Sequence, residues 1–456
     1  MANFIDAVYL PTLGPHYLWH RLVSGKYGPA IAEKTGEIPD RFKSAGTRVI
    51  SADSPYSESP CLWLHAVSVG EVQASRELVT RFMADNPTWE LRVSTTTATG
   101  RKVATDLYGA ECVFYYPLDF SWMVKKAIER IRPSLIVLME LEIWPNFLRE
   151  TRRAGIPVAV ANARITERSV RRLTKIPSLA REMGLAVEEW YAQTATYAER
   201  LKTIGIPPER IEVFGSIKYD AIPEKIDADA TRRYRRLFGC PAEGGRNLIV
   251  AGSTHPGEEE AVLEAWSSIA PRGERPRLLL TPRHPERMPV IEKLACRYGT
   301  VVKRSALPEP GYEDNAPMPV EADIILGDTM GELAKIYCAA DIVFVGGTFT
   351  NRGGQNFMEP CGLGKPTVVG PNLWNFSEPA ELLGAEQCLR IVPEAGDLGG
   401  VFREFYEHPD LAAEMGRRAR ELLLRQRGVA ARIGKSLNVL AVNVLQGKYR
   451  PVARRR

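Results

Sequence analysis

Short apolar runs alternate with longer amphipathic segments along most of this chain. The first runs after Cys61 are CLWLHAV, LRVSTTT, CVFYY, SLIVLME and IPVAVAN. The pattern restarts after a charge-rich stretch with NLIVAGS, RLLLTP, ADIILG, ADIVFVGG and KPTVVG. Continuous apolar strands separated by helices indicate parallel sheets covered on both faces. We therefore predict an α/β protein.

The chain is long enough for more than one hydrophobic core. Its 456 residues exceed the usual size of a single domain, so we expect two doubly wound Rossmann-like domains facing a cleft, joined near 205–220. The predicted N-terminal domain covers 1–210 and the C-terminal domain covers 211–430. Residues 431–456 are predicted to form a helix and a basic tail, which could cross back to the N-terminal domain.

Charge and cysteine usage exclude some classes of function. The 60 Lys and Arg residues against 55 Asp and Glu give a net charge of +5, which is too mild to indicate a nucleic-acid partner. The seven cysteines are scattered, without a CxxC pair or a nearby His. This usage indicates a reducing cytoplasm and no structural zinc.

Two basic or apolar segments suit a membrane surface without spanning it. No apolar run approaches the length needed to cross a bilayer. The segment from Phe4 to Trp19 could be an interfacial anchor or a first helix packed on the body of the protein. The arginines between Arg417 and Arg432 and the tail 448–456 fit either solvated helix faces or an anionic membrane surface.

The segment GGTFTNRGGQNFME, Gly346 to Glu359, follows an apolar run and precedes an expected helix. Its glycines allow close backbone approach to a ligand, and the amides of a helix start attract an anion. Asn356 and Glu359 would share one face of the first turns. The segment could hold a phosphate and a ribose diol, or could be a Gly-rich loop with a capping carboxylate.

The other expected strand ends are also rich in polar residues. Ligands of doubly wound sheets bind beyond the carboxyl ends of the strands. These ends carry SVGE (68–71), TTTATG (95–100), NARITERS (162–169), STHPGEEE (253–260), PRHPER (282–287) and DTMGEL (328–333). These segments hold more polar and charged residues than the capping of helices and turns requires. The chain lacks the GxGxxG, GxxxxGK[ST] and GxSxG motifs and a DxD-type metal pair, which argues against hydride transfer, ATP hydrolysis and serine hydrolysis.

The ordered set SVGE, TTTATG, YYPLD, ELEIWPN, NARITERS, GSIKYD, STHPGEEE, PRHPER, DTMGEL and GGQNFMEP resembles the 3-deoxy-D-manno-octulosonic acid (Kdo) transferases of lipid A biosynthesis. The resemblance covers about 41–385. It implies a GT-B fold and inverting transfer of Kdo from CMP-Kdo to the glucosamine disaccharide of a lipid A precursor. It also implies that no metal or other cofactor is bound, and that the enzyme is peripheral, on the anionic surface of the cytoplasmic face of the inner membrane.

The resemblance assigns roles to residues at the strand ends. Glu71 matches the base that accepts the proton of the attacking hydroxyl, although an acid in the first turn of a helix is also explained by the helix dipole. Arg283 and the amides around Gly353 would meet the charge on the departing phosphate, and Glu359 would bind ribose. The donor-binding candidates are Ser253, Thr254, His255, Arg283, His284, Asp328, Met330, Gly331, Gly353, Gly354, Asn356 and Glu359. The acceptor-side candidates are Ser68, Gly70, Thr96 and Arg164.

Other residues and readings stay open. Glu140, Glu142, Trp144 and Asn146 are interpreted as scaffold rather than chemistry. The chain departs from the family in reading GGQNFMEP for GGHNPLEP and in having Ser216 where Asn is usual. The alternatives are a sugar-nucleotide 2-epimerase of the same fold, or a non-catalytic paralogue that binds a nucleotide sugar or lipid A. Sequence does not set the number of Kdo residues transferred.

Overall fold

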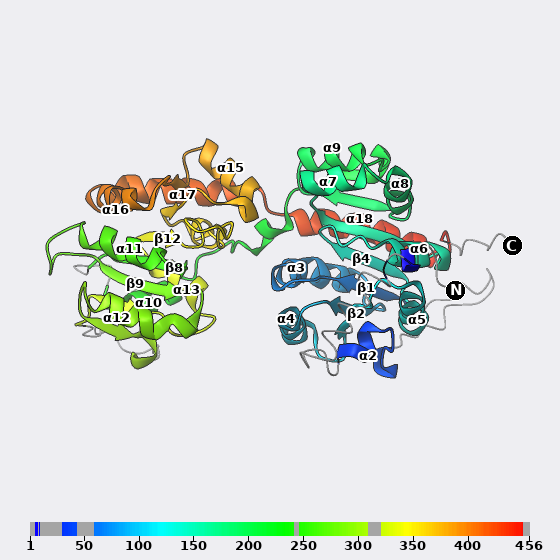
Figure 1. The fold of residues 1–456 in the computed structure, drawn as a ribbon, viewed down its shortest axis with the longest axis horizontal. Coiled ribbons are helices and arrows are strands. Elements are labelled where there is room, and N and C mark those ends of the chain that lie inside the picture. Colours follow the sequence, from blue (N-terminus) through cyan, green and yellow to red (C-terminus); the bar gives the residue numbers. More distant parts are fainter. Residues whose placement is uncertain are drawn as a thin grey trace. The chain divides into compact units, whose positions relative to one another are not determined.

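The computed structural model describes residues 5–7, 9, 30–42, 59–240, 246–308 and 321–449 (Figure 1). Contacts divide the chain into two units. Unit 1 comprises Met1–Ala221 and Gly428–Arg456, and unit 2 comprises Ile222–Arg427. The sequence placed the divisions after residues 210 and 430, whereas the contacts place them after Ala221 and Arg427.

Unit 1 is built on a seven-stranded parallel sheet in the order β3-β2-β1-β4-β5-β6-β7. Its strands are β1 (Cys61–His65), β2 (Glu90–Thr95), β3 (Val113–Tyr115), β4 (Leu135–Met139), β5 (Val158–Ala163), β6 (Glu189–Ala192) and β7 (Ile211–Val213). Its α-helices are α2 (Ala30–Lys34), α3 (Val69–Asp85), α4 (Ala98–Tyr108), α5 (Ser121–Ile131), α6 (Pro145–Ala154), α7 (Glu167–Leu173), α8 (Pro177–Leu185), α9 (Ala195–Thr203) and α18 (Val429–Leu445). Short 3-10 turns are η1 (Asp40–Phe42), η2 (Pro208–Arg210) and η3 (Ile217–Ala221).

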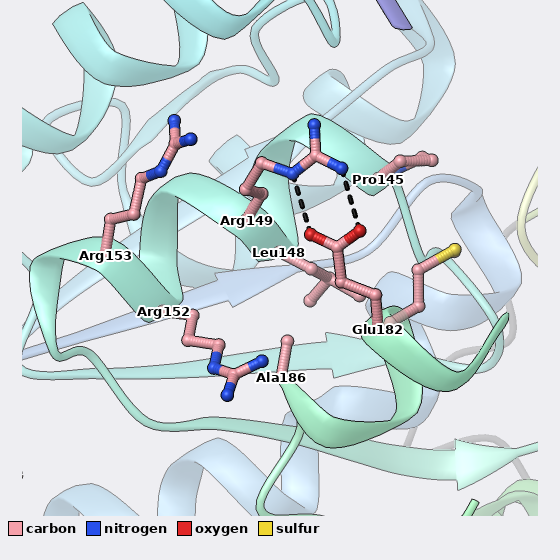
Figure 2. Close-up of a pocket in the computed structure, with 8 residues that line it drawn as sticks. Pro145, Leu148, Arg149, Arg152, Arg153, Glu182 and Ala186 are labelled. Atoms are coloured by element: carbon pink, nitrogen blue, oxygen red, sulfur yellow. Dashed lines mark hydrogen bonds and ion pairs between the residues drawn. The ribbon is translucent and has the colours of Figure 1, made fainter. Parts of the chain in front are cut away.

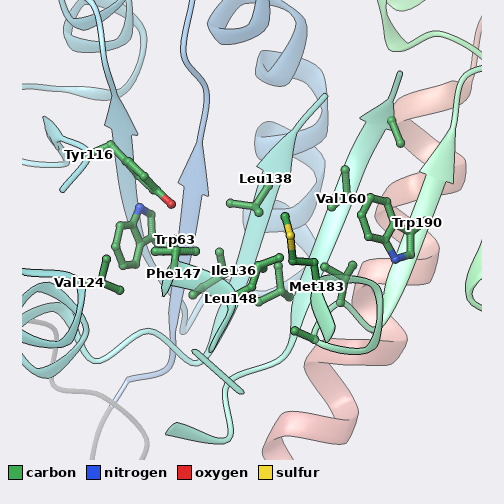
Figure 3. Packing of buried hydrophobic residues seen from close by; sticks show 14 of the residues in the cluster. Trp63, Tyr116, Val124, Ile136, Leu138, Phe147, Leu148, Val160, Met183 and Trp190 are labelled. Atoms are coloured by element: carbon green, nitrogen blue, oxygen red, sulfur yellow. The ribbon is translucent and has the colours of Figure 1, made fainter. Parts of the chain in front are cut away.

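Strand β1 shows why the sequence runs are continuously apolar. All five of its residues are buried, and successive side chains of a strand point to opposite faces. Trp63 therefore packs with Phe147 and Ile136 in one core (Figure 3), while Leu62 and Leu64 pack in the core on the other face. A sheet covered by helices on both sides requires this composition.

Helix α18, the last helix of the chain, belongs to unit 1. Its buried residues Ile433, Leu437 and Val444 lie in the same core as Leu62 and Leu64, so the helix covers one face of the sheet. The Asp220 carboxylate accepts hydrogen bonds from the backbone N–H groups of Gly428 and Ala430, both at 2.5 Å. An acid at the positive end of the helix dipole stabilises the point where the chain returns.

Unit 2 repeats the arrangement with the strand order β10-β11-β9-β8-β12-β13-β14, again all parallel. Its strands are β8 (Leu248–Thr254), β9 (Arg277–Pro282), β10 (Val301–Lys303), β11 (Ile324–Leu326), β12 (Ile342–Val345), β13 (Thr367–Val369) and β14 (Arg390–Ile391). Its α-helices are α10 (Ala228–Leu237), α11 (Glu258–Ser267), α12 (Met288–Ala295), α13 (Leu333–Ile336), α14 (Met358–Gly362), α15 (Ser377–Ala385), α16 (Leu398–Glu407) and α17 (Pro409–Arg425). The 3-10 turns are η4 (Pro285–Arg287), η5 (Arg304–Ala306), η6 (Tyr337–Ala339), η7 (Trp374–Phe376) and η8 (Ala395–Asp397).

The strand orders identify where each unit can bind a ligand. The order reverses between β1 and β4 in unit 1 and between β8 and β12 in unit 2. At such switch points the neighbouring connections leave on opposite sides of the sheet, which opens a crevice at the carboxyl ends. The prediction of two doubly wound Rossmann-like units is confirmed.

The burial of α18 against the sheet of unit 1 can be tested by mutation. Ile433 has no solvent exposure, so Ile433→Ala should lower the free energy of unfolding of unit 1 by about 2–5 kcal/mol, since the cavity adds to the lost apolar burial. Urea unfolding followed by circular dichroism measures the change. Val439→Ala on the same helix is the control, because Val439 is 62% exposed and should cost less than about 0.5 kcal/mol. Equal effects of the two variants would contradict the packing.

Candidate active site

Glu71 lies at the switch point of unit 1, in the first turn of α3 directly after β1. Ser68, the N-cap of α3, accepts a hydrogen bond from the Glu71 N–H at 3.4 Å and donates its hydroxyl to Glu71 Oε1 at 2.9 Å. The Val67 N–H donates to Glu71 Oε2 at 2.9 Å. This reciprocal pattern is a variant of the capping box, so the carboxylate is held rigidly at the carboxyl edge of the sheet.

The surroundings of Glu71 change its acidity. Burial raises the pKa of Glu71 to about 7, the Val67 and Ser68 hydrogen bonds oppose the rise, and the charges of Glu140 and Glu142 add to it. Burial also raises the pKa of Glu142, whose Oε2 accepts from the Trp144 indole N–H at 3.1 Å. A carboxyl group with a pKa near neutrality can act as a general base.

Glu140 and Glu142 follow β4, the strand beside β1, so their charges act on Glu71. Lys218 Nζ lies 3.5 Å from Glu140 Oε1 and balances part of this negative charge. The sequence favoured a scaffold role for the two acids. The signal that pointed to more was their place at the end of a strand next to β1.

The acceptor-side candidates occupy the same edge of the sheet. Ser68 and Gly70 begin α3, Thr96 follows β2 and Arg164 follows β5. The Thr96 carbonyl accepts from Lys34 Nζ at 3.3 Å, which ties α2 to this edge. The candidates therefore come from three strand ends of one sheet.

Backbone strain marks the same strand ends in both units. Among the described residues, five non-glycine residues have positive φ, and three of them are Glu140 (57°), Asn162 (58°) and Ser253 (55°). These three lie at the carboxyl ends of β4, β5 and β8. A left-handed backbone conformation is unfavourable for a non-glycine residue, and residues held in it are common at functional sites.

Glu258 organises the switch point of unit 2. Its side chain is 1% exposed and accepts four backbone N–H bonds, from His255 at 2.9 Å, Gly347 at 2.7 Å, and Thr348 and Phe349 at 2.9 Å each. The carboxylate therefore joins the loop after β8 to the glycine loop, Gly346 to Gln355, after β12. Its neighbour Glu259, also buried, binds Arg287 through both oxygens.

The sequence did not single out Glu258 or Glu259. Both lie in STHPGEEE (253–260), where they were predicted only as part of a polar strand end. The sequence signal that could have identified them is the run of three consecutive acids at one helix start. In the structure two of the three, Glu258 and Glu259, are buried. Buried carboxylates need hydrogen-bond or ionic partners, and here the partners are the loops around the candidate site.

The glycine loop depends on its glycines for shape. Gly353 has φ of 79°, and a Cβ there would lie 2.4 Å from Trp374 Nε1. The N–H groups of Gly354 and Gln355 donate to the carbonyls of Gly347 and Gly346 at 2.9 and 3.1 Å. Those two amides are therefore engaged within the loop rather than directed at a ligand, and α14, which follows, has only five residues.

Asn356 and Glu359 are brought together as the sequence suggested. Asn356 Nδ2 donates to Glu359 Oε1 at 2.9 Å, and Asn356 Oδ1 accepts from the Met358 N–H at 3.2 Å. Glu359 keeps solvent contact, yet loss of hydration raises its pKa against the opposing effect of the Asn356 bond. A solvent-accessible carboxylate of this kind can accept hydrogen bonds from a diol.

Four basic side chains gather beside the glycine loop. The pKa of His255 is lowered by burial first and then by the positive charges of His284 and Arg352, with a smaller effect of Arg283. The His255 and His284 rings lie 5.4 Å apart, and the backbone N–H of Arg283 donates to the Thr254 carbonyl at 2.9 Å. Arg352 was missed by the sequence reasoning, although it lies inside the glycine loop. This positive field favours an anion.

The remaining donor candidates have local roles or lie farther along the sheet. Thr254 is buried and its hydroxyl donates to Glu259 Oε1 at 3.2 Å. Asp328, after β11, accepts from the N–H and hydroxyl of Ser305 at 2.9 and 2.5 Å. Met330 in the same loop is 78% exposed and Gly331 has φ of 82°.

Neither a metal site nor a membrane span is found in the described ranges. There, no cluster of three or more His, Cys, Asp or Glu side chains is arranged to hold a metal ion. No helix in those ranges is both long and apolar enough to cross a bilayer.

Comparison with solved structures shows the fold. A glycosyltransferase from Rickettsia africae matches with a TM-score of 0.54 at 12% identity, over 85% of this chain and 99% of that one. The UDP-GlcNAc 2-epimerase from Neisseria meningitidis, bound to UDP-GlcNAc, matches with a TM-score of 0.53 at 13% identity, over 80% of this chain and 99% of that one. Both matches extend across two Rossmann-like units and support the GT-B fold.

Comparison of sequences identifies the family. Residues 37–221 match the family model described as 3-deoxy-D-manno-octulosonic-acid transferase (kdotransferase). The 3-deoxy-D-manno-octulosonic acid transferase of Haemophilus influenzae is 31% identical over 379 residues, 82% of this chain and 85% of the relative. That of Bordetella pertussis is 33% identical over 368 residues, 78% of this chain and 81% of the relative. The chain belongs to the 3-deoxy-D-manno-octulosonic acid transferase family and is a glycosyltransferase.

Proposed function

We propose that this family member transfers Kdo from CMP-Kdo to a hydroxyl of the glucosamine disaccharide of a lipid A precursor, with inversion at the anomeric carbon. The observation that carries the proposal is Glu71. In a chain of this family, a rigidly held carboxylate with a pKa of about 7 lies at the switch point of unit 1. The named relatives support the sugar that is transferred.

Glu71 would act as the general base. The acceptor oxygen attacks the anomeric carbon of Kdo, and its proton passes to the Glu71 carboxylate. The bond between the anomeric carbon and the phosphate oxygen breaks, and CMP leaves with the electron pair. Ser68 and Val67 keep the carboxylate in place during this transfer.

Unit 2 would hold the donor. The phosphate of CMP gains negative charge as it leaves, and fixed cations stabilise such charge in the transition state. Arg283 and Arg352 supply this positive charge beside the two histidines, and Glu359 would accept hydrogen bonds from the ribose hydroxyls. Asp328, Met330 and Gly331 are the proposed lining of the cytosine pocket.

The lipid nature of the proposed acceptor indicates where in the cell the enzyme works. A lipid A precursor carries acyl chains, so its head group is presented at a membrane surface. We infer that the enzyme is peripheral and works at the anionic cytoplasmic face of the inner membrane. The anchor expected between Phe4 and Trp19 falls mostly outside the described residues, as does the tail after residue 449.

Product assays with the two kinds of sugar nucleotide separate the proposed function from its two alternatives. The structural match to a 2-epimerase is at 13% identity, which supports the shared fold and no activity. Incubation with CMP-Kdo and the lipid A disaccharide, read by mass spectrometry, should show a mass increase for each Kdo added. Epimer formation from a UDP-sugar would indicate the epimerase, and binding without either product would indicate a non-catalytic paralogue. The same spectrum counts the Kdo residues added.

The assignment of Glu71 predicts a pH dependence. The carboxylate accepts the proton only when ionised, so kcat/KM should fall about tenfold per pH unit as the pH drops below the pKa of about 7. Glu71→Gln should lower turnover about 10²- to 10⁴-fold. Its CMP affinity, measured by calorimetry, should be unchanged. Turnover near the wild-type value would overturn the assignment.

Ser68→Ala provides a graded version of that test. The Ser68 hydroxyl lowers the pKa of Glu71, so its removal should move the acidic limb of the kcat/KM profile to higher pH. The loss of the N-cap should also cost about 1 kcal/mol of stability. If the limb stays in place, a group other than Glu71 sets it.

If Arg283 and Arg352 bind the phosphate of the donor, their removal should weaken CMP binding. Hydrogen bonds to charged groups contribute about 1.5–3 kcal/mol, so Arg352→Gln or Arg283→Gln should weaken CMP binding about 10- to 100-fold by calorimetry. Arg297→Gln, at an exposed arginine after α12, is the charge-matched control and should bind as the unmodified protein does. Unchanged affinity in both cluster variants would remove these arginines from the donor site.

A further inference from the structure

The stretch 145–185, which spans α6, α7 and α8, carries a large excess of positive charge. It contains nine Arg or Lys residues and three Glu residues, a net charge of +6, whereas the whole chain carries +5. A second and larger excess lies in 417–456, which holds twelve Arg or Lys residues and one Glu, a net charge of +11. The sequence alone predicts no role for the excess in 145–185, and it assigns possible membrane contact to the N-terminal segment, the arginines after residue 416 and the C-terminal tail.

The fold presents this charge on an outer face. Val170 and Leu173 of α7 pack against the core of unit 1, so the other side of this short helix carries exposed arginines. Ile176, between α7 and α8, is 52% exposed. We define the basic face as the exposed residues Arg152, Arg153, Arg168, Arg171, Arg172, Lys175, Ile176 and Arg181.

Few of these cations are neutralised. Arg153 pairs with Glu150, and Arg171 lies 3.9 Å from Glu167, which bonds more closely to Arg200 at 2.9 Å. Within the part of the chain that the structure describes, no ion pair engages the other members of the face. These are Arg152, Arg168, Arg172, Lys175 and Arg181.

A hollow of about 210 Å³ lies between α6 and α8 beside this face. Leu148, Met183 and Ala186 give it apolar walls, and Arg149 is joined to Glu182 by two hydrogen bonds of 2.8 Å (Figure 2). Figure 2 shows the guanidinium groups of Arg152 and Arg153 directed away from that pair. Apolar side chains are thus bordered by two arginines, of which Arg153 is paired with Glu150 and Arg152 has no ion pair among the described residues. This combination suits the boundary between head groups and acyl chains.

The arginine cluster after residue 416 is a weaker candidate for the same role. Arg417 bonds to Glu414 and Glu421, Arg420 donates to the Glu224 carbonyl at 2.6 Å, and Arg432 donates to the Phe214 carbonyl at 2.5 Å. These groups stabilise the two units from within. Of the two interpretations of Arg417 to Arg432, these contacts favour structural helix faces over a membrane surface, and the tail after residue 449 lies outside the described residues.

We propose that the basic face docks unit 1 onto an anionic lipid bilayer, with Ile176 entering the interface. The inference rests on the proposed function, because a lipid-linked acceptor requires contact with a membrane. Each basic residue near an anionic surface strengthens binding about fivefold. The exposed Ile176 favours a bilayer over a nucleic acid, whose phosphate backbone offers no apolar layer to receive it.

Vesicle flotation with the full chain tests the proposal. The probes are vesicles of phosphatidylcholine with about one quarter phosphatidylglycerol, and pure phosphatidylcholine as reference, at low salt. The triple variant Arg168→Gln, Arg172→Gln, Lys175→Gln should lower partitioning onto anionic vesicles on the order of 100-fold. The control Arg272→Gln, Lys293→Gln, Arg297→Gln removes the same charge from exposed residues of unit 2 and should change partitioning less than about fivefold.

Further readouts separate this proposal from the proposed function. Ile176→Ser should lower the part of the binding that persists at high salt. Transfer to a detergent-dispersed acceptor should be unchanged in the triple variant, whereas transfer to a vesicle-embedded acceptor should fall. Equal loss in the two triple variants, equal binding to both vesicle types, or binding to a DNA oligonucleotide without vesicle binding would overturn the basic face. Absence of transfer with normal vesicle binding would instead overturn the proposed function alone.

Discussion

All strands of each sheet run in parallel, and this constraint decides where the chemistry can lie. Parallel strands bring their carboxyl ends to one edge, and the helices that connect them cover both faces. Polar residues can therefore be concentrated only at the ends of the strands. Glu71 and Glu140 follow neighbouring strands of unit 1, and Glu258 meets the glycine loop across neighbouring strands of unit 2. The positive φ of Glu140 and Ser253 shows that these turns are strained to hold their positions.

Within unit 2, one buried carboxylate fixes the geometry of the loops. Burying a charge is unfavourable unless hydrogen bonds replace its hydration, and Glu258 gains four backbone N–H donors. The amides that it binds are withdrawn from any ligand, and so are those of Gly354 and Gln355. An anion bound beside this loop would depend more on side-chain cations, and Arg283 and Arg352 are cations next to it.

The sequence predicts the repeated features better than the singular ones. Two doubly wound sheets follow from apolar runs such as CLWLH and LIVAGS, because a doubly covered strand must be apolar on both sides. The pairing of Asn356 with Glu359 follows from their spacing. Glu258 could not be assigned, because an acid at a helix start has the same appearance whether it faces solvent or a neighbouring loop. Arg352 and the basic face depend on which residues tertiary packing leaves exposed.

Glu71 combines two demands that oppose each other. As part of a capping box it accepts hydrogen bonds from Val67 and Ser68, and these stabilise the carboxylate and weaken it as a base. Burial and the charges of Glu140 and Glu142 act in the other direction and bring its pKa to about 7. A free glutamate with its ordinary pKa would be ionised at neutral pH but would attract a proton weakly. The protein thus obtains a rigid carboxylate from the helix start and restores its basicity mainly through burial, with a smaller contribution from the carboxylates after the next strand.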